Sequence, residues 1–115
     1  MAPREEPALH ILIVSFQLKD MTEEAFRALC DGLAPRFAAV PGLLGKVWLA
    51  SPATNTYGGV YTWRDRRAME DYTASELFGA VVAHPNFANV TATDFGVLDG
   101  PTRITHGPAP IPAAA

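Results

Sequence analysis

Residues 9–18 (LHILIVSFQL) restrict the possible folds of this chain more than any other segment. Successive side chains of a β-strand point to opposite faces, and here both alternating sets are apolar. The two sets are Leu9, Ile11 and Ile13, and Leu12, Val14 and Phe16. Such a strand is typical of the centre of a sheet that is covered on both faces. Any fold for this chain therefore has to cover both faces of this strand.

Residues 41–63 (PGLLGKVWLASPATNTYGGVYTW) carry the densest group of aromatic side chains and predict a β-hairpin with a loop at residues 51–56. Leu44, Lys46, Trp48 and Ala50 share one face of its first strand, and Tyr57, Gly59, Tyr61 and Trp63 share one face of its second. Adjacent glycines weaken a strand unless the strand bends or another group approaches its backbone closely. We therefore expect the hairpin to face a flat apolar ligand or a second sheet.

A first helix is expected between these two segments. Asp20 is placed to cap it, with Glu23 three residues later as in a capping box. Its buried stripe consists of Phe26, Leu29, Cys30, Leu33 and Phe37. Because a proline inside a helix removes a hydrogen bond and clashes with the preceding turn, Gly32 and Pro35 predict a kink or break near residues 32–34.

Two shorter helices and a last strand follow the hairpin. Asp65 caps a helix whose inward face carries Ala68, Met69 and Tyr72, and Ser75 caps another over residues 76–83. Pro85 ends that helix, and residues 90–98 predict the last strand. The sequence Asp99-Gly100-Pro101 then predicts a turn.

The order of these elements is β-α-β-β-α-β, which is the ferredoxin-like α+β arrangement of a four-stranded antiparallel sheet. We expect a single domain over residues 1–106, followed by a flexible Pro/Ala tail over residues 107–115. All the helices of this arrangement pack on one face of the sheet, yet residues 9–18 are apolar on both faces. The economical solution is a homodimer in which two sheets pack face to face.

Composition restricts the functional classes. The net charge is −3 and no stripe of Lys or Arg is present, which argues against a nucleic-acid surface. A single cysteine, Cys30, fits a reducing compartment. No apolar run approaches the roughly 20 residues of a membrane span, and the first residues lack the arrangement of a signal peptide. We therefore expect a cytoplasmic protein without membrane or nucleic-acid partners.

Several residues are candidates for chemistry, and each also has a structural interpretation. Trp48, Tyr61 and Trp63 either line a pocket or pack at the dimer interface, and Tyr72 is either a pocket phenol or a core residue. Asp94 forms an ion pair or acts as a tuned acid or base, whereas Lys46 is expected to reach solvent from an edge strand. His84 lies at a helix C-terminus, where a cation is stabilised. The three histidines lie far apart, so no metal site is expected.

The stretch PGLLGKVWLASPATNTYGGVYTWRDRRAMEDY resembles the core signature of the YdhR-type monooxygenase family in its Pro-Gly-Leu, Lys-x-Trp and Gly-Gly-x-Tyr elements. The Asp94-Phe95-x-Val97 pattern resembles the family's last strand. Trp63, Ser75 and Phe78 also resemble the pattern of the wider antibiotic-biosynthesis monooxygenase superfamily. The resemblance implies a dimeric α+β barrel and oxygenase chemistry on a small aromatic or polyketide-like molecule, without flavin or metal. Haem-degrading relatives need an axial histidine on the second helix. The sole candidate, His84, lies at a helix end just before Pro85, so no haem is expected.

Oxygenation without a cofactor requires a phenol or enol substrate whose anion reduces oxygen, and a protein that supplies a base, oxyanion donors and a dry pocket. We expect this pocket between sheet and helices, with Tyr61, Tyr72, His84 and Asp94 as candidate catalytic residues. Trp48, Trp63 and Phe26 are the candidate substrate-binding residues. Two alternatives use the same pocket: a non-catalytic dimeric barrel that binds a small ligand, and a cyclase or isomerase.

Overall fold

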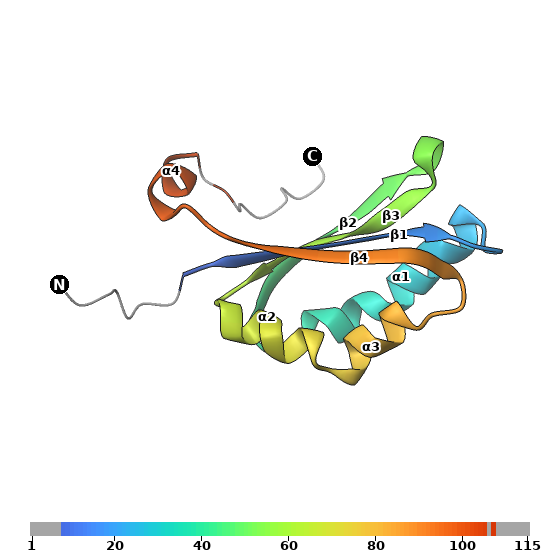
Figure 1. Ribbon diagram of the computed structural model, residues 1–115, viewed down its shortest axis with the longest axis horizontal. Helices are drawn as coiled ribbons and strands as arrows, with labels where there is room; N and C mark the ends of the chain where they lie inside the picture. Colours follow the sequence, from blue (N-terminus) through green and yellow to red (C-terminus); the bar gives the residue numbers. More distant parts are fainter. Residues whose placement is uncertain (1–7, 106, 108–115) are drawn as a thin grey trace.

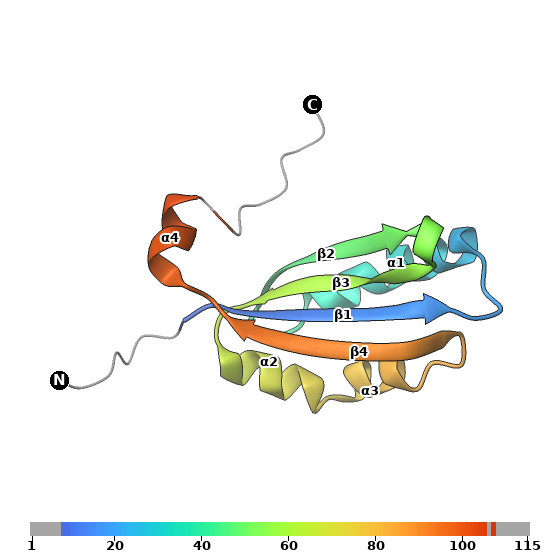
Figure 2. The same ribbon diagram turned by 45° about the horizontal axis from the view of Figure 1, so that its top comes forward.

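The computed structural model describes residues 8–105 and 107. Its elements are β1 (His10–Leu18), α1 (Glu23–Ala38), β2 (Leu43–Ser51), a 3-10 turn (Pro52–Thr54), β3 (Thr56–Trp63), α2 (Arg66–Thr73), α3 (Glu76–Val82), β4 (Phe87–Gly96) and α4 (Asp99–Ile104). The strands form one antiparallel sheet in the order β2-β3-β1-β4 (Figure 2). This is the predicted ferredoxin-like fold, with β1 in the interior of the sheet. The predicted flexible tail lies outside the described residues apart from Gly107.

The helices α1, α2 and α3 lie on one face of the sheet, and α4 lies beyond its end (Figure 1). The core fills the space between this face and the three helices. Its buried members are Leu12, Val14, Phe16, Phe26, Phe37, Tyr57, Tyr61, Trp63, Ala68, Met69 and Tyr72. The strands β1 and β3 supply alternate residues to this buried set, so the aromatic face of β3 looks toward the helices. Of the described helices, none is long and apolar enough to cross a membrane.

The opposite face of the sheet carries exposed apolar side chains. Val47 and Leu49 of β2 are 44% and 37% exposed, and Phe95 of β4 is 50% exposed. The strand register places them in rows with Ile11, Ile13 and Val60 on the same face. We call this surface, made of Ile11, Ile13, Val47, Leu49, Val60 and Phe95, the open face. The first strand is therefore apolar on both sides, as predicted, and residues 8–105 cover only one of them.

The first helix differs from its prediction at both ends. Thr22, not Asp20, is the N-cap, because the Thr22 hydroxyl accepts a hydrogen bond from the Ala25 N–H. Asp20 lies outside the helix with φ 54°. The helix also continues through Gly32 and Pro35 to Ala38, so the predicted break is absent. The buried ring of Phe37 packs against Trp48 and Tyr61, and this contact holds the turn that follows the proline.

Three further differences arise from local geometry. A β-bulge between Leu43 and Gly45 places Leu43 on the helix-covered face, so Leu44 is 59% exposed instead of sharing a face with Lys46. The last strand begins at Phe87, earlier than predicted, because it pairs with Leu18. Asp99, where a turn was predicted, is instead the first residue of the short helix α4.

The predicted caps of the second and third helices are confirmed. The Asp65 carboxylate accepts from the Ala68 N–H at 2.8 Å, and the Ser75 hydroxyl accepts from the Phe78 N–H at 3.3 Å. These two caps place α2 and α3 end to end across the same face of the sheet (Figure 1). The arrangement brings Tyr72 and Phe78 into contact, with ring centroids 5.3 Å apart.

Candidate functional site

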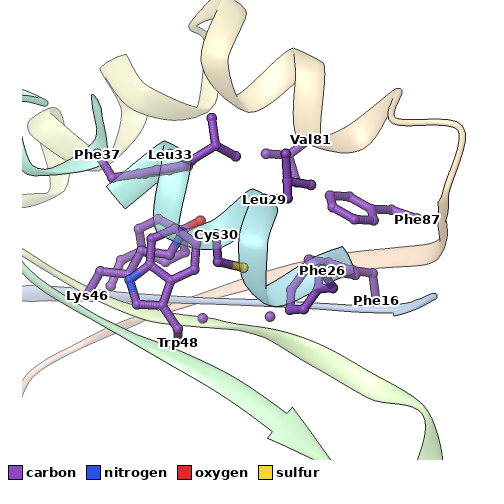
Figure 3. Close-up of a pocket in the computed structure, with 13 residues that line it drawn as sticks. Phe16, Phe26, Leu29, Cys30, Leu33, Phe37, Lys46, Trp48, Val81 and Phe87 are labelled. Carbon is purple, nitrogen blue, oxygen red and sulfur yellow. The ribbon is translucent and has the colours of Figure 1, made fainter. Parts of the chain in front are cut away.

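A small apolar cavity lies between the sheet, α1 and α3 (Figure 3). Its volume is about 30 Å³. Most of its lining is hydrocarbon, supplied by Phe16, Phe26, Leu29, Leu33, Phe37, Val81 and Phe87; Cys30, Lys46, Trp48, Gly58, Gly59 and Tyr61 complete it. A cavity therefore lies between sheet and helices, where a substrate pocket was predicted, but it is much smaller than such a pocket, and α1 forms its main wall. Of the seven predicted site residues, Phe26, Trp48 and Tyr61 line it.

The amine of Lys46 enters this cavity among three aromatic rings. Its Nζ lies 3.4 Å from the ring centroid of Trp48, 3.5 Å from that of Phe37 and 4.6 Å from that of Tyr61. Burial lowers the pKa of Lys46 to about 7, and a weaker electrostatic contribution from Cys30 acts in the opposite direction. The ring faces attract the ammonium form. Both protonation states of this amine are therefore accessible near neutral pH.

The paired glycines of β3 make this arrangement possible. A Cβ atom on Gly59 would lie 2.8 Å from the Lys46 Cε atom, so a side chain there would displace the amine. A Cβ atom on Gly58 would lie 1.9 Å from the carbonyl oxygen of Val14. The expected close approach to the glycine backbone is therefore present, and it comes from β1 on one side and from Lys46 on the other.

Tyr61 and Tyr72 form a buried hydroxyl pair beside the cavity. Their oxygens are 3.2 Å apart, and either hydroxyl can donate to the other. Burial is the main reason that the pKa of Tyr61 lies well above its ordinary value. Burial likewise raises the pKa of Tyr72 to about 12. Both phenols therefore stay protonated at neutral pH and act as hydrogen-bond donors, not as bases.

Trp63 supports this pair from behind without reaching the cavity. Its ring stacks on Tyr61 with centroids 6.0 Å apart and contacts Tyr72 at 5.1 Å. The side chain is fully buried, and its indole N–H has no hydrogen-bond partner within residues 8–105 and 107. The prediction that Tyr61 and Trp63 share a face is confirmed, and that face looks toward the helices.

Two open hollows flank the cavity along the line where α1 meets the edge strand β2. The larger has a volume of about 470 Å³ and is lined by Glu23, Phe26, Arg27, Cys30, Asp31, Ala34, Trp48, Leu49, Ala50 and Tyr57. The smaller, of about 220 Å³, is lined by Ala34, Phe37, Ala38, Leu43, Leu44, Gly45, Lys46 and Trp48. Trp48 lines both hollows and the cavity. We call the two hollows together the α1–β2 groove.

A hydrogen-bonded chain lies at the mouth of the larger hollow. The Tyr57 hydroxyl donates to Glu23 at 2.6 Å, and the Arg27 guanidinium donates to the same carboxylate at 3.0 Å. The hydrogen bond from Tyr57 is the main cause that lowers the pKa of Glu23. The groove therefore has a polar mouth and an apolar floor, which suits an aromatic molecule with polar substituents.

The other two predicted acid/base residues lie outside the cavity. His84 stacks on Phe87 with ring centroids 4.2 Å apart, and its Nδ1 accepts from the Asn86 N–H. Asp94 is exposed and bonds to His10 through an Nε2–Oδ2 contact of 2.6 Å, which lowers its pKa. The strand β1 lies between Asp94 and Tyr61, so two strand spacings, about 10 Å, separate their backbones.

The expectation that Lys46 reaches solvent is met only in part, because its half-buried side chain lines the cavity as well as the smaller open hollow. Its strand is an edge strand, as assumed, but the C-terminal half of α1 covers the inner face of that strand. The sequence contained two signals for this arrangement: Lys46 alternates with Trp48, and Gly59 leaves space opposite them. Phe37, Cys30 and Leu33 were assigned to the buried stripe of α1 without a role in the site.

Within the described residues, no cluster of three or more His, Cys, Asp or Glu side chains is arranged to hold a metal ion.

Comparison with known structures finds the same fold in several proteins of low sequence identity. NE2512 from Nitrosomonas europaea, a protein of unknown function, has a TM-score of 0.69 and 16% identity, covering 95% of this chain and 99% of its own. SnoaB, a cofactor-independent oxygenase from Streptomyces nogalater, has a TM-score of 0.63 and 19% identity, covering 79% and 94%. The haem degrader MhuD from Mycobacterium tuberculosis has a TM-score of 0.62 and 17% identity, covering 77% and 95%.

These likenesses place the fold among the ferredoxin-like chains of dimeric α+β barrels. A search of curated proteins finds no match. Comparison with protein families matches residues 11–108, most of the chain, to the family described as "Putative mono-oxygenase ydhR". This match includes every strand residue from Ile11 onward and all the residues that line the cavity. The chain therefore belongs to the ydhR mono-oxygenase family.

Proposed function

We propose that the protein is a cofactor-independent monooxygenase that oxidises a small aromatic or polyketide-like phenol or enol. Family membership supports monooxygenase chemistry, and SnoaB, which shares the fold, is a cofactor-independent oxygenase. The observation that carries the proposal is the Lys46 amine, which lies among three aromatic rings with a pKa near 7. The substrate occupies the α1–β2 groove against Trp48, with its hydroxyl directed toward Lys46.

Lys46 acts as the general base in this proposal. A base is most effective when its pKa lies near the working pH, and an amine with a pKa near 7 meets this condition. The neutral amine removes the proton from the substrate hydroxyl. The resulting ammonium then lies beside the phenolate or enolate and stabilises it in surroundings from which most water is excluded. The three ring faces hold the ammonium in the same position.

Tyr61 acts as a hydrogen-bond donor to the substrate oxygen. Its raised pKa keeps it protonated, and when Tyr72 donates to Tyr61 the Tyr61 proton is free to point toward a substrate oxygen beside Lys46. Tyr72 thus orients Tyr61 and is a positioning residue. In the overall reaction the substrate supplies all the electrons: one oxygen atom of O₂ enters the product and the other leaves as water.

The test is oxygen uptake by the purified protein with a panel of hydroxynaphthalenes, without added cofactor and with a metal chelator. We expect uptake, incorporation of one atom from ¹⁸O₂ into the product, and a kcat/KM that rises with pH through about 7 as Lys46 loses its proton. Lys46→Met should lower kcat/KM by about 10²–10⁴-fold and abolish this pH dependence. Lys19→Met is the matched control, because Lys19 is exposed and lies outside the cavity and groove.

Two results would contradict this proposal. The first is absence of oxygen uptake with every phenol while the protein is folded and binds the compounds, which indicates a non-catalytic binding barrel. The second is exchange of substrate hydrogen with deuterated solvent without uptake of oxygen, which indicates a cyclase or isomerase that uses the same base. In either case the metal content and absorption spectrum show whether a cofactor accompanies the purified protein.

We also propose that the protein is a homodimer in which the open face of one copy packs on the open face of another. The support is the set of apolar side chains on this face, with Val47, Leu49 and Phe95 between 37% and 50% exposed. Contiguous apolar surfaces of this kind mark interaction sites in proteins that stay in solution. A two-fold axis allows the same surface to serve both copies.

A further inference from the structure

The cavity beneath the sheet is far smaller than a site for an aromatic substrate. Its volume is about 30 Å³, whereas pockets for drug-sized ligands have volumes of about 300–1,000 Å³. The hollows of the α1–β2 groove, at about 470 and 220 Å³, are the spaces that suit an aromatic ring system. The cavity and the groove share Phe26, Cys30, Phe37, Lys46 and Trp48. The cavity therefore adjoins the proposed substrate site and shares part of its lining.

The lining of this cavity favours an apolar occupant over water. A buried water needs two to four polar partners, and small cavities with apolar walls stay dry and take up apolar guests such as xenon. Seven of the thirteen lining side chains are pure hydrocarbon. Of the polar groups, the Tyr61 hydroxyl is paired with Tyr72, and the Lys46 amine faces aromatic rings. Burial raises the pKa of the Cys30 thiol, which keeps it protonated and weakly polar.

We propose that this cavity binds molecular oxygen, the second substrate of the reaction proposed above, on which this inference rests. A diatomic, apolar molecule matches both the size and the lining of the cavity. Its position also matches the reaction, because Trp48 and Lys46 both line the cavity and lie side by side (Figure 3). Oxygen held there lies next to a substrate in the groove, with the amine near both.

In the first redox step the Lys46 amine has a second role, which is to balance the negative charge that forms. Removal of the substrate proton places that proton on the Lys46 Nζ atom and leaves a substrate anion. The anion then transfers one electron to O₂, which gives a substrate radical and superoxide without making or breaking a bond. The ammonium faces the superoxide across an apolar space, where an opposite charge is stabilising. Combination of the two radicals forms the carbon–oxygen bond.

Oxygen binding can be measured without any turnover. Dissolved O₂ is paramagnetic and accelerates the NMR relaxation of methyl groups that it touches. In the substrate-free protein under oxygen pressure, the methyl groups of Leu29, Leu33 and Val81 should relax faster than those of Leu18 and Val90. The last two are partly buried like the first three but lie outside the cavity lining, so they report contact with oxygen from solvent and general penetration of the core.

A pair of neighbouring substitutions tests the role of the space itself. Val81→Ile adds one methylene to a side chain that lines the cavity, and Val82→Ile makes the same change at an exposed residue of the same helix. We expect Val81→Ile to suppress the relaxation enhancement and to raise the KM for oxygen several-fold, more than the KM for the phenol. Val82→Ile should change neither quantity.

The outcomes separate this inference from the proposed function. Selective relaxation at Leu29, Leu33 and Val81 supports the oxygen pocket even if no phenol is oxidised. Uniform relaxation of all five methyl-bearing residues overturns the pocket even if oxygen uptake is observed. An unchanged KM for oxygen in folded Val81→Ile, with turnover present, also overturns it.

Discussion

Tyr61 and Tyr72 place two hydroxyl groups 3.2 Å apart where solvent hardly reaches, at 2% and 3% exposure. The two hydroxyls form a hydrogen bond with each other, so burying them costs little free energy as long as both are present. Removing one leaves the other buried without that partner, and an unsatisfied buried polar group costs about 1–3 kcal/mol. The stability of the core and the orientation of Tyr61 in the cavity therefore depend on the same hydrogen bond.

Tyr61→Phe and Tyr72→Phe should each lower the free energy of unfolding by about 1–2 kcal/mol, whereas the double variant should lose clearly less than the sum. Urea unfolding of the four proteins gives the coupling energy. Tyr57→Phe is the control, because the Tyr57 hydroxyl bonds to Glu23 near the surface and its loss leaves Glu23 bonded to Arg27. If the losses of unfolding free energy in the two single variants add up to the loss in the double variant, the hydrogen bond between Tyr61 and Tyr72 is contradicted.

The same variants separate catalysis from positioning. Tyr61 lines the cavity and Tyr72 does not, so Tyr61→Phe should lower kcat by about 10²-fold and Tyr72→Phe by less. Equal losses would mean that the two hydroxyls act as one unit.

At this scale the sequence predicted which residues share a face but not which ones meet. The alternation of β3 correctly placed Tyr57, Tyr61 and Trp63 together, because that relation is local. The partial burial of Lys46 was not predicted because it depends on where the end of α1 lies. Asp94 was placed near the site because the sequence does not show that β1 separates its strand from β3.

Glycines in a helix and in the sheet of this chain have opposite roles. Gly32 lies in the exposed part of α1, and a Cβ atom there would have no neighbour within 4 Å. A Cβ atom on Gly58 would collide with the carbonyl of Val14. The first glycine only weakens its helix, whereas the second allows β3 to approach β1.

The same substitution at the two positions should therefore have opposite signs. Gly32→Ala should raise the free energy of unfolding by about 0.5–1 kcal/mol, since alanine is the better helix former. Gly58→Ala should lower it by roughly 2 kcal/mol or more, because backbone atoms cannot move aside as a side chain can. Thermal unfolding of both variants is the measurement, and a stabilised Gly58→Ala would show that the close approach is absent.

The elements themselves were predictable wherever a local signal sets them. Asp65 and Ser75 cap their helices as predicted because a cap depends on residues three positions apart. Of the kink or break predicted near residues 32–34, the break is absent, and packing of Phe37 offsets the local penalty of Pro35. The bulge at Leu43 and the helix α4 carry no sequence signal as clear as a cap.

In the part of the chain that the structure describes, the sheet has one face packed against helices and one open face, and the proposed homodimer covers the open face. Val47→Glu should shift the protein from dimer to monomer in light scattering at micromolar concentration and lower its melting temperature, because dimerisation stabilises the folded state by mass action. Val82→Glu is the matched control, since Val82 is 49% exposed, similar to the 44% of Val47, but lies on α3 on the opposite side of the sheet. A monomeric unsubstituted protein would contradict the proposal.

The strand order β2-β3-β1-β4 also determines which parts of the sheet can form early during folding. Only β2 and β3 are neighbours both in the chain and in the sheet, so this hairpin closes a short loop. The strand β1 precedes both of its partners, and β4 returns to it only after α3. Contacts between such distant segments form slowly, so β1 is the first strand in the chain and the last to be fully paired. Until then at least one of its edges stays unpaired and its two apolar faces are incompletely covered, so self-association competes with folding.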